Sequence, residues 1–181
     1  MTRDPFDTLS APARQIIADA RAAGAYELLV VRAPQTRAKL EPLLERLSPD
    51  ALFEARVTRP EEARCTLAGL WLLTDDLGRS HRIVEDVATP SGSFWHAIVH
   101  RREGDFSNSR YWYARCAEHA VRRADALVTG PRLVELVERA NVLPDGDPRR
   151  AEAVAAQRRE WELLLDYSAR QAVGAAAGGG G

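Results

Sequence analysis

Two histidines and a glutamate have the spacing that places them on one face of a predicted helix. In the segment 94–103 (FWHAIVHRRE), His96, His100 and Glu103 fall at positions i, i+4 and i+7, and residues at these positions share a helical face. Two imidazoles and a carboxylate in this arrangement can hold Zn²⁺ or another divalent metal. The residue after His96 is Ala97, so the HExxH motif of zinc proteases, with its built-in general base, is absent.

A third nitrogen ligand would have to come from elsewhere in the chain. His81, close to Val84 in the preceding predicted helix, is the first candidate, and His119 is a less obvious one. The metal hypothesis therefore comprises four residues, which are His81, His96, His100 and Glu103. The alternative, which the sequence leaves open, is that these histidines bond to backbone or carboxylate groups between packed helices.

Arginines gather around the same predicted turn and suggest a second kind of chemistry. They are Arg101, Arg102, Arg110 and Arg115. Guanidinium groups bind carboxylate or phosphate bidentately, and a histidine can carry a proton near neutral pH. His100 and Glu103 are therefore the candidate catalytic residues of an enzyme acting on a small anionic substrate. The alternative is that Arg102 and Arg115 form ion pairs with neighbouring acidic residues and only fix the hairpin.

A polar and aromatic face is expected on the helix that follows. Asn108, Trp112 and Arg115 fall at i, i+4 and i+7, and a groove lined in this way could bind a peptide. With the turn included, the candidate ligand-binding residues are Arg101, Arg102, Asn108, Tyr111, Trp112 and Arg115. Basic and aromatic residues also interleave in proteins that bind single-stranded nucleic acid. The formal net charge of −1 and the nearby acidic residues argue against that partner.

The turn between the two predicted helices has its own local chemistry. Gly104 can take a left-handed conformation that ends the first helix, and Asp105 or Ser107 can cap the second. Cys116 stands in no nucleophile motif and is expected to be a small packing residue.

Helix signals dominate the rest of the chain and predict an all-α fold. Ser10 with Pro12 begins a helix that Gly24 closes, and Leu40 to Leu47 has the period of an amphipathic helix. Further helix starts are the capping box Thr58-Arg-Pro-Glu61, Pro131 (with Asn141 as its end) and Asp147-Pro148. The apolar run 26–31 (YELLVV) could instead be a short strand, as could 52–58, but we favour helix or extended linker for both.

An internal repeat suggests how these helices pack. Residues 75–87 align without gaps on residues 104–116, with Asp76 matching Asp105 and Ser80 matching Ser109. Each copy follows an apolar helical run, and the offset is 29 residues, near the period of helix-turn-helix repeats. We therefore predict antiparallel helical hairpins with tetratricopeptide-like packing, in which a small residue lets the second helix approach the first.

The same region resembles a group of uncharacterised bacterial proteins. Their recurrent string is W-H-x-x-x-H-R-x-E-G-D-x-x-N-[AS]-x-Y-W-[YF], and this chain carries it between Trp95 and Tyr113. The stretch 68–81 (AGLWLLTDDLGRSH) looks like part of the same pattern. The resemblance covers roughly residues 65–119, under a third of the chain, and it implies no particular activity.

Composition sets the outer limits of these interpretations. The chain has 181 residues, 45% of them hydrophobic, which suits one helical domain over 1–172 followed by a flexible Gly/Ala tail over 173–181. Two cysteines do not make a disulfide framework, and neither a signal-peptide pattern nor a membrane-spanning stretch is present. We therefore expect a cytoplasmic protein with no membrane or nucleic-acid partner.

Two classes of function remain open at this point. The preferred one is a non-catalytic helical module that binds a protein partner or small ligand through the hairpin 94–119. The alternative is a small metal- or histidine-dependent enzyme acting on an anionic substrate, with Zn or another divalent metal as its cofactor.

Overall fold

The computed structural model describes residues 5–32, 40–125 and 129–174, and within them the all-α prediction is confirmed. These residues form nine α-helices and no β-strand. The helices are α1 (Ala11–Ala22), α2 (Glu41–Glu45), α3 (Pro60–Trp71), α4 (Leu77–Val84), α5 (Pro90–Glu103), α6 (Phe106–Arg115), α7 (Ala120–Ala124), α8 (Pro131–Ala140) and α9 (Pro148–Val173). The start of the predicted tail (173–181) is wrong, because Val173 is the last residue of α9 and Gly174 is its C-cap; the rest of that segment lies outside the described residues.

Caps and prolines set most of the helix ends. A proline occupies the first turn of α1, α3, α5, α8 and α9, where its missing N–H costs no hydrogen bond. Asp105 and Asp147 cap α6 and α9 with their side chains. The predicted capping box at Thr58 is wrong, because Arg59 is the N-cap residue of α3. The hydroxyl of Thr58 donates instead to the carbonyl of Ala172 at the end of α9.

The alternative of a strand at 26–31 is also wrong. Tyr26 has a positive φ of 65°, and the segment then runs between helices without a partner strand. Its backbone groups are bonded by side chains and helix ends: the Gln157 amide donates to the carbonyls of Tyr26 and Leu28, and the Val31 amide donates to the carbonyl of Arg102. In the described part of the chain, strand-like pairing is confined to one isolated bridge between Leu9 and Phe53.

Two consecutive hairpins, α3–α4 and α5–α6, form the centre of the molecule. Asp75 and Gly104 stand in left-handed conformation, and Asp76 and Asp105 cap the helices that follow. The side chains of the aligned serines are buried in both hairpins. The two copies therefore share the same local geometry, as their alignment predicts. The tetratricopeptide-like label stays a prediction.

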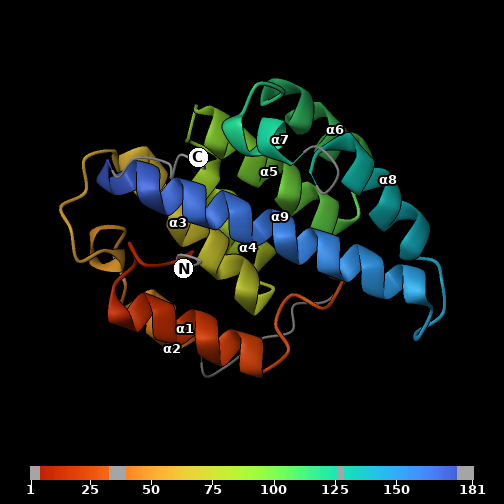
Figure 1. Cartoon of the computed structure of the whole chain (residues 1–181), viewed down its shortest axis with the longest axis horizontal. Helices are drawn as coiled ribbons and strands as arrows, with labels where there is room; N and C mark the ends of the chain where they lie inside the picture. The colour runs from red at the N-terminus through yellow and green to blue at the C-terminus, as the bar shows by residue number, and fades with distance from the viewer. Residues whose placement is uncertain (1–4, 33–39, 126–128, 175–181) are drawn as a thin grey trace.

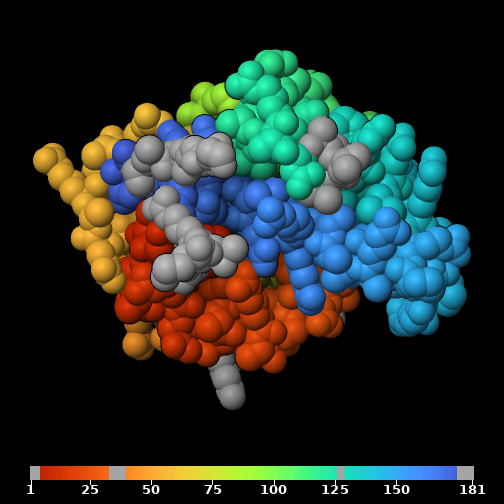
Figure 2. Space-filling view, in the orientation of Figure 1, coloured from red at the N-terminus to blue at the C-terminus, as the bar shows by residue number. Residues whose placement is uncertain are grey.

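The last helix ties these hairpins to the N-terminal part of the chain. Figure 1 shows α9 lying across the molecule, with α1 on one side and α5 to α8 on the other. The space-filling view shows that one side of α9 stays exposed between them (Figure 2). On its inner side, the indole of Trp161 donates to the carbonyl of Gly69 at 2.7 Å. A Cβ atom at Gly69 would lie 2.6 Å from the ring of Trp95, so α3, α5 and α9 approach closely at this glycine.

Among the described residues, no helix combines the length and apolar character needed to cross a bilayer.

Candidate metal site at the histidine cluster

Three histidines from two helices converge where α4 packs against α5. His81 comes from α4, while His96 and His100 lie one turn apart on α5. One ring nitrogen from each lies within 4.8 Å of the other two, and the Nε2 atoms of His81 and His96 are 3.0 Å apart. Two nitrogen ligands on a tetrahedral Zn²⁺ are about 3.4 Å apart, given Zn–N bonds of about 2.0–2.1 Å. The His81–His96 separation is shorter than this and the bound of 4.8 Å is longer, so the three side chains would have to shift to share a metal.

The second nitrogen of His100 faces a carboxylate. Its Nδ1 lies 2.8 Å from Glu103 Oε2, and the imidazole side chain is 11% exposed. A neutral imidazole that donates Nδ1–H to this carboxylate keeps its lone pair on Nε2. The amide of Asn108 lies 3.2 Å from that Nε2 and can donate to it. Glu103 therefore orients His100 rather than joining the three nitrogens, and Asn108 competes for the lone pair.

His96 is buried between aromatic rings. Its imidazole stacks on Trp112 with ring centroids 4.1 Å apart and an interplanar angle of 8°, and the residue is 4% exposed. Burial, together with the neighbouring His81 and His100, lowers the pKa of His96 to about 4. The imidazole is therefore neutral near pH 7, which is the form that binds metal.

The surface beside the cluster is aromatic and basic. Tyr111 is 55% exposed, and the guanidinium of Arg115 lies over the rings of Tyr111 and Trp112 at 5.8 and 5.3 Å from their centroids. Arg110 is held by an ion pair with Glu138 of α8. Of the predicted ligand-binding residues, Asn108, Tyr111, Trp112 and Arg115 thus lie on one side of α6 next to the histidines.

Arg101 and Arg102 do not belong to this surface. Both are fully buried. Arg101 forms an ion pair with Glu160 of α9 at 2.5 Å, and Arg102 forms one with Asp75 at 2.6 Å. Neither guanidinium is accessible to a ligand from solvent, so their expected role in ligand binding is replaced by a role in packing. The alternative interpretation expected Arg102 to pair with a neighbouring acidic residue, but its partner Asp75 lies 27 residues away in the chain.

The fourth histidine lies in a separate buried group. His119 accepts a hydrogen bond from the Val121 amide at Nδ1, and its Nε2 is 3.2 Å from Ser91 Oγ. Ser91 in turn donates to Glu62. Because Nδ1 is an acceptor, the proton of neutral His119 sits on Nε2 and points at Ser91. This tautomer cannot accept the serine proton, so the arrangement does not form a nucleophilic triad.

The two cysteines are free and buried. Burial raises the pKa of Cys116 to about 11 and also raises that of Cys65. Both thiols are therefore protonated near neutral pH, and a thiol is a poor nucleophile. Cys116 is 2% exposed, in line with the packing role that its surroundings predict.

Sequence reasoning missed the acceptors of the buried arginines. Asp75 and Glu160, which accept from the two guanidinium groups, are both buried, and the ring of Tyr26 lies 4.0 Å from the guanidinium of Arg102. Gln157, which donates to the carbonyls of Tyr26 and Leu28, is buried as well. A signal was present in α9, because Gln157 and Glu160 fall on the same helical face as Trp161 and Leu164. Polar residues on an apolar helical face indicate buried hydrogen-bond partners.

No protein-family model, no curated protein and no solved structure matches this chain, so its functional assignment starts from the geometry of its own residues.

Proposed function

We propose that this protein binds a divalent transition metal, Zn²⁺ before others, through His81, His96 and His100. The observation that carries the proposal is the convergence of one nitrogen from each histidine within 4.8 Å of the other two. Imidazole nitrogen suits Zn²⁺ and its neighbours in the first transition row, and does not suit Mg²⁺ or Ca²⁺, which prefer oxygen ligands.

The contact of Glu103 with the second ring nitrogen of His100 supports this proposal. Metal-binding histidines commonly donate their other ring N–H to a carboxylate, which fixes the tautomer and makes the ligand more basic. The contact of His100 Nδ1 with Glu103 has this form. Three protein ligands also leave a coordination position for water or a small molecule, as in catalytic rather than structural zinc sites. A bound metal would supply Lewis acidity at that position, with Arg115 as a nearby exposed cation for an anionic substrate.

The direct test is metal binding by untagged, metal-free protein. Zn²⁺ should bind near one equivalent in isothermal titration calorimetry, and Co²⁺ should give the visible absorption bands of a four-coordinate site. His96→Ala and His100→Ala should each abolish binding, while His119→Gln, outside the cluster, should leave it unchanged. Binding that persists when all three cluster histidines are alanine would overturn the proposal.

A second candidate function is a non-catalytic module that binds a protein partner or small ligand through the hairpin 94–119. The exposure of Tyr111, with Arg115 over its ring, favours it, because exposed aromatic and arginine side chains dominate binding surfaces. This second proposal includes a cytoplasmic location, tetratricopeptide-like packing and no nucleic-acid partner. It is tested by capturing partners with wild type and with Tyr111→Ala. A partner that binds both equally would exclude this surface.

A further inference from the structure

A pocket of about 520 Å³ lies between α3, α4 and the loop before residue 50. Its lining residues are Pro49, Arg64, Leu67, Trp71, Arg79, Arg82 and Ile83. The volume falls within the range of small-molecule sites, about 300–1,000 Å³. The lining shares no residue with the histidine cluster, although α4 contributes His81 to one and two arginines to the other.

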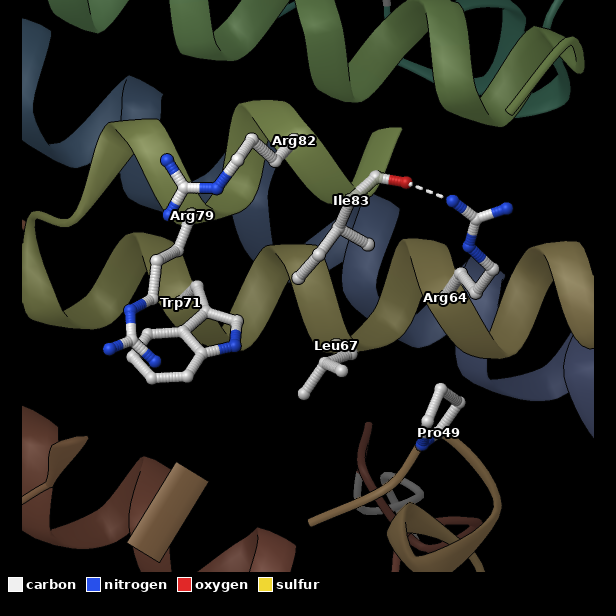
Figure 3. A pocket seen from close by; sticks show the side chains of 7 residues that line it. All are labelled: Pro49, Arg64, Leu67, Trp71, Arg79, Arg82 and Ile83. Carbon is white, nitrogen blue, oxygen red and sulfur yellow. Dashed lines mark hydrogen bonds between the residues drawn. The ribbon is translucent and has the colours of Figure 1, made fainter. Parts of the chain in front are cut away.

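The charge of the lining has one sign. It contains three arginines and no acidic residue. Figure 3 shows the side chain of Arg64 at one end of the pocket and those of Arg79 and Arg82 at the other. Arg82 has no hydrogen-bond or ion-pair partner among the residues that the structure describes. A pocket with guanidinium groups at both ends attracts a ligand that is acidic at both ends.

The middle of the pocket is apolar. Leu67 and Ile83 lie between the two basic ends, and Pro49 lies below Arg64 (Figure 3). Trp71 is 4% exposed, and the guanidinium of Arg79 lies 4.5 Å from the centre of its indole. Arg79 also contacts Glu45 and Asp76, which hold it over the ring. The Arg79 end is therefore preorganised, because its long side chain is already ordered before a ligand binds.

Arg64 is held at the opposite end by the backbone. One of its nitrogens donates to the carbonyl of Ile83 at 2.8 Å, as the dashed line in Figure 3 shows. This contact spans α3 and α4 and leaves the other guanidinium nitrogens available to a ligand. Arg64 is thus positioned, and no carboxylate of the described residues forms an ion pair with it.

We propose that this pocket binds a small organic anion that carries two acidic groups separated by an apolar middle. The two acidic groups pair with Arg64 at one end and with Arg82 at the other, where Arg79 is already paired with Glu45 and Asp76. The apolar middle covers Leu67 and Ile83. An inorganic phosphate or a simple monocarboxylate satisfies only one end.

The proposal is tested with straight-chain dicarboxylates from hexanedioate to decanedioate, titrated into wild type by calorimetry. Octanoate and octanediol are the matched probes that lack one or both charges. At least one dicarboxylate should bind about ten-fold more tightly than its monocarboxylate, and its affinity should fall as salt is raised. Binding should quench tryptophan fluorescence in wild type and in Trp112→Phe but not in Trp71→Phe.

Variants locate the two charged ends. Arg82→Gln should weaken dicarboxylate binding about ten-fold without loss of the fold, because Arg82 has no partner among the described residues to lose. Arg64→Gln should weaken it similarly, and Arg132→Gln, exposed on α8, should have no effect. Three results would overturn the proposal: no binding of any dicarboxylate, equal binding of octanoate, or tighter binding of a glutamate-rich peptide, which would make the occupant a polypeptide. All of these measurements use metal-free protein, so they stand apart from the metal site.

Discussion

Ser80 and Ser109 make the same contact in successive hairpins. Each is fully buried and donates its hydroxyl to the carbonyl of the residue twelve positions earlier, Ala68 at 3.0 Å and Ala97 at 2.7 Å. Because each hydroxyl reaches the facing backbone directly, the two helices of a hairpin approach each other closely at this point. A larger side chain has no space there.

Replacing Ser109 with leucine should therefore overpack the interface of α5 and α6. We expect a loss of about 1–3 kcal/mol in the free energy of unfolding, and a similar loss for Ser80→Leu in the other hairpin. Urea denaturation followed by circular dichroism measures both. Ser107→Leu, exposed in the first turn of the same helix, is the control and should change stability little. If Ser109→Leu is as harmless as the control, the two hairpins do not share the packing described.

The buried pair of Arg101 and Glu160 should be costly to break from either side. Both side chains are 0% exposed, so Glu160→Gln leaves a buried guanidinium without its counter-charge. We expect a loss of about 3–5 kcal/mol, measured by urea denaturation. The double variant Arg101→Met with Glu160→Met removes both charges and should be more stable than Glu160→Gln. The single variants Arg101→Met and Glu160→Met complete a double-mutant cycle with it, and an additive cycle would show that the two charges are not coupled.

Glu103→Gln should weaken metal binding and leave the fold intact. Loss of an outer carboxylate from a metal-binding histidine typically reduces metal affinity about 10–100-fold. The Glu103 side chain is 37% exposed, so its charge contributes little to stability. Zinc affinity is measured by competition with a chromogenic chelator, beside Glu118→Gln as an exposed control. Unchanged affinity in Glu103→Gln would remove Glu103 from the site.

Acidification should destabilise the protein through His119. Burial, with Arg122 adding to it, lowers the pKa of His119 to about 4, below its ordinary 6.5. Between these values the unfolded chain binds a proton that the folded chain does not, so stability is lost as pH falls from about 6.5 to about 4. Glu62, reached through Ser91, acts in the opposite sense, because burial raises its pKa. At pH values just above 4.5, the Glu62 carboxyl of the unfolded chain has lost its proton, whereas that of the folded chain keeps it.

His119→Gln isolates the contribution of His119. The variant lacks the titrating imidazole, so its stability should fall less than that of wild type on acidification. Urea titrations of both proteins at a series of pH values give the difference directly. A difference in unfolding free energy that stays constant from pH 7 to pH 4 would contradict the lowered pKa of His119.

The features that local sequence predicted correctly are those that depend on neighbouring residues. Gly104 ends α5 with a φ of 84°, Asp105 caps α6, and Asn141 follows the last residue of α8. The capping prediction for Thr58 was wrong for a long-range reason, because its hydroxyl donates to the carbonyl of Ala172. Capping rules describe the local competition for a backbone amide and contain no information about a distant helix end.

In the candidate site, too, local spacing predicted some residues correctly and long-range contacts decided the others. His96 and His100 could be paired from their spacing alone, and His81 from the repeat that precedes them. The burial of Arg101 and Arg102 could not be predicted, because most of α5 is buried, polar residues included, and its sequence does not separate a solvent face from a core face. Their partners Glu160 and Asp75 lie 59 and 27 residues away, and single-sequence periodicity does not report contacts at such separations.

The position of α9 also determines when the protein can fold during its own synthesis. A ribosome releases α3 and α5 well before residues 157–161 emerge, and chains are made at only about 5–20 residues per second. Throughout that interval the nascent chain lacks Glu160, the partner of Arg101. It also lacks Gln157, whose amide bonds the 26–28 turn, and Trp161, whose indole bonds Gly69. Arg101 must keep its hydration shell until then, since a guanidinium without a partner is too costly to bury. The interior of this protein therefore closes only after its last long helix has left the ribosome.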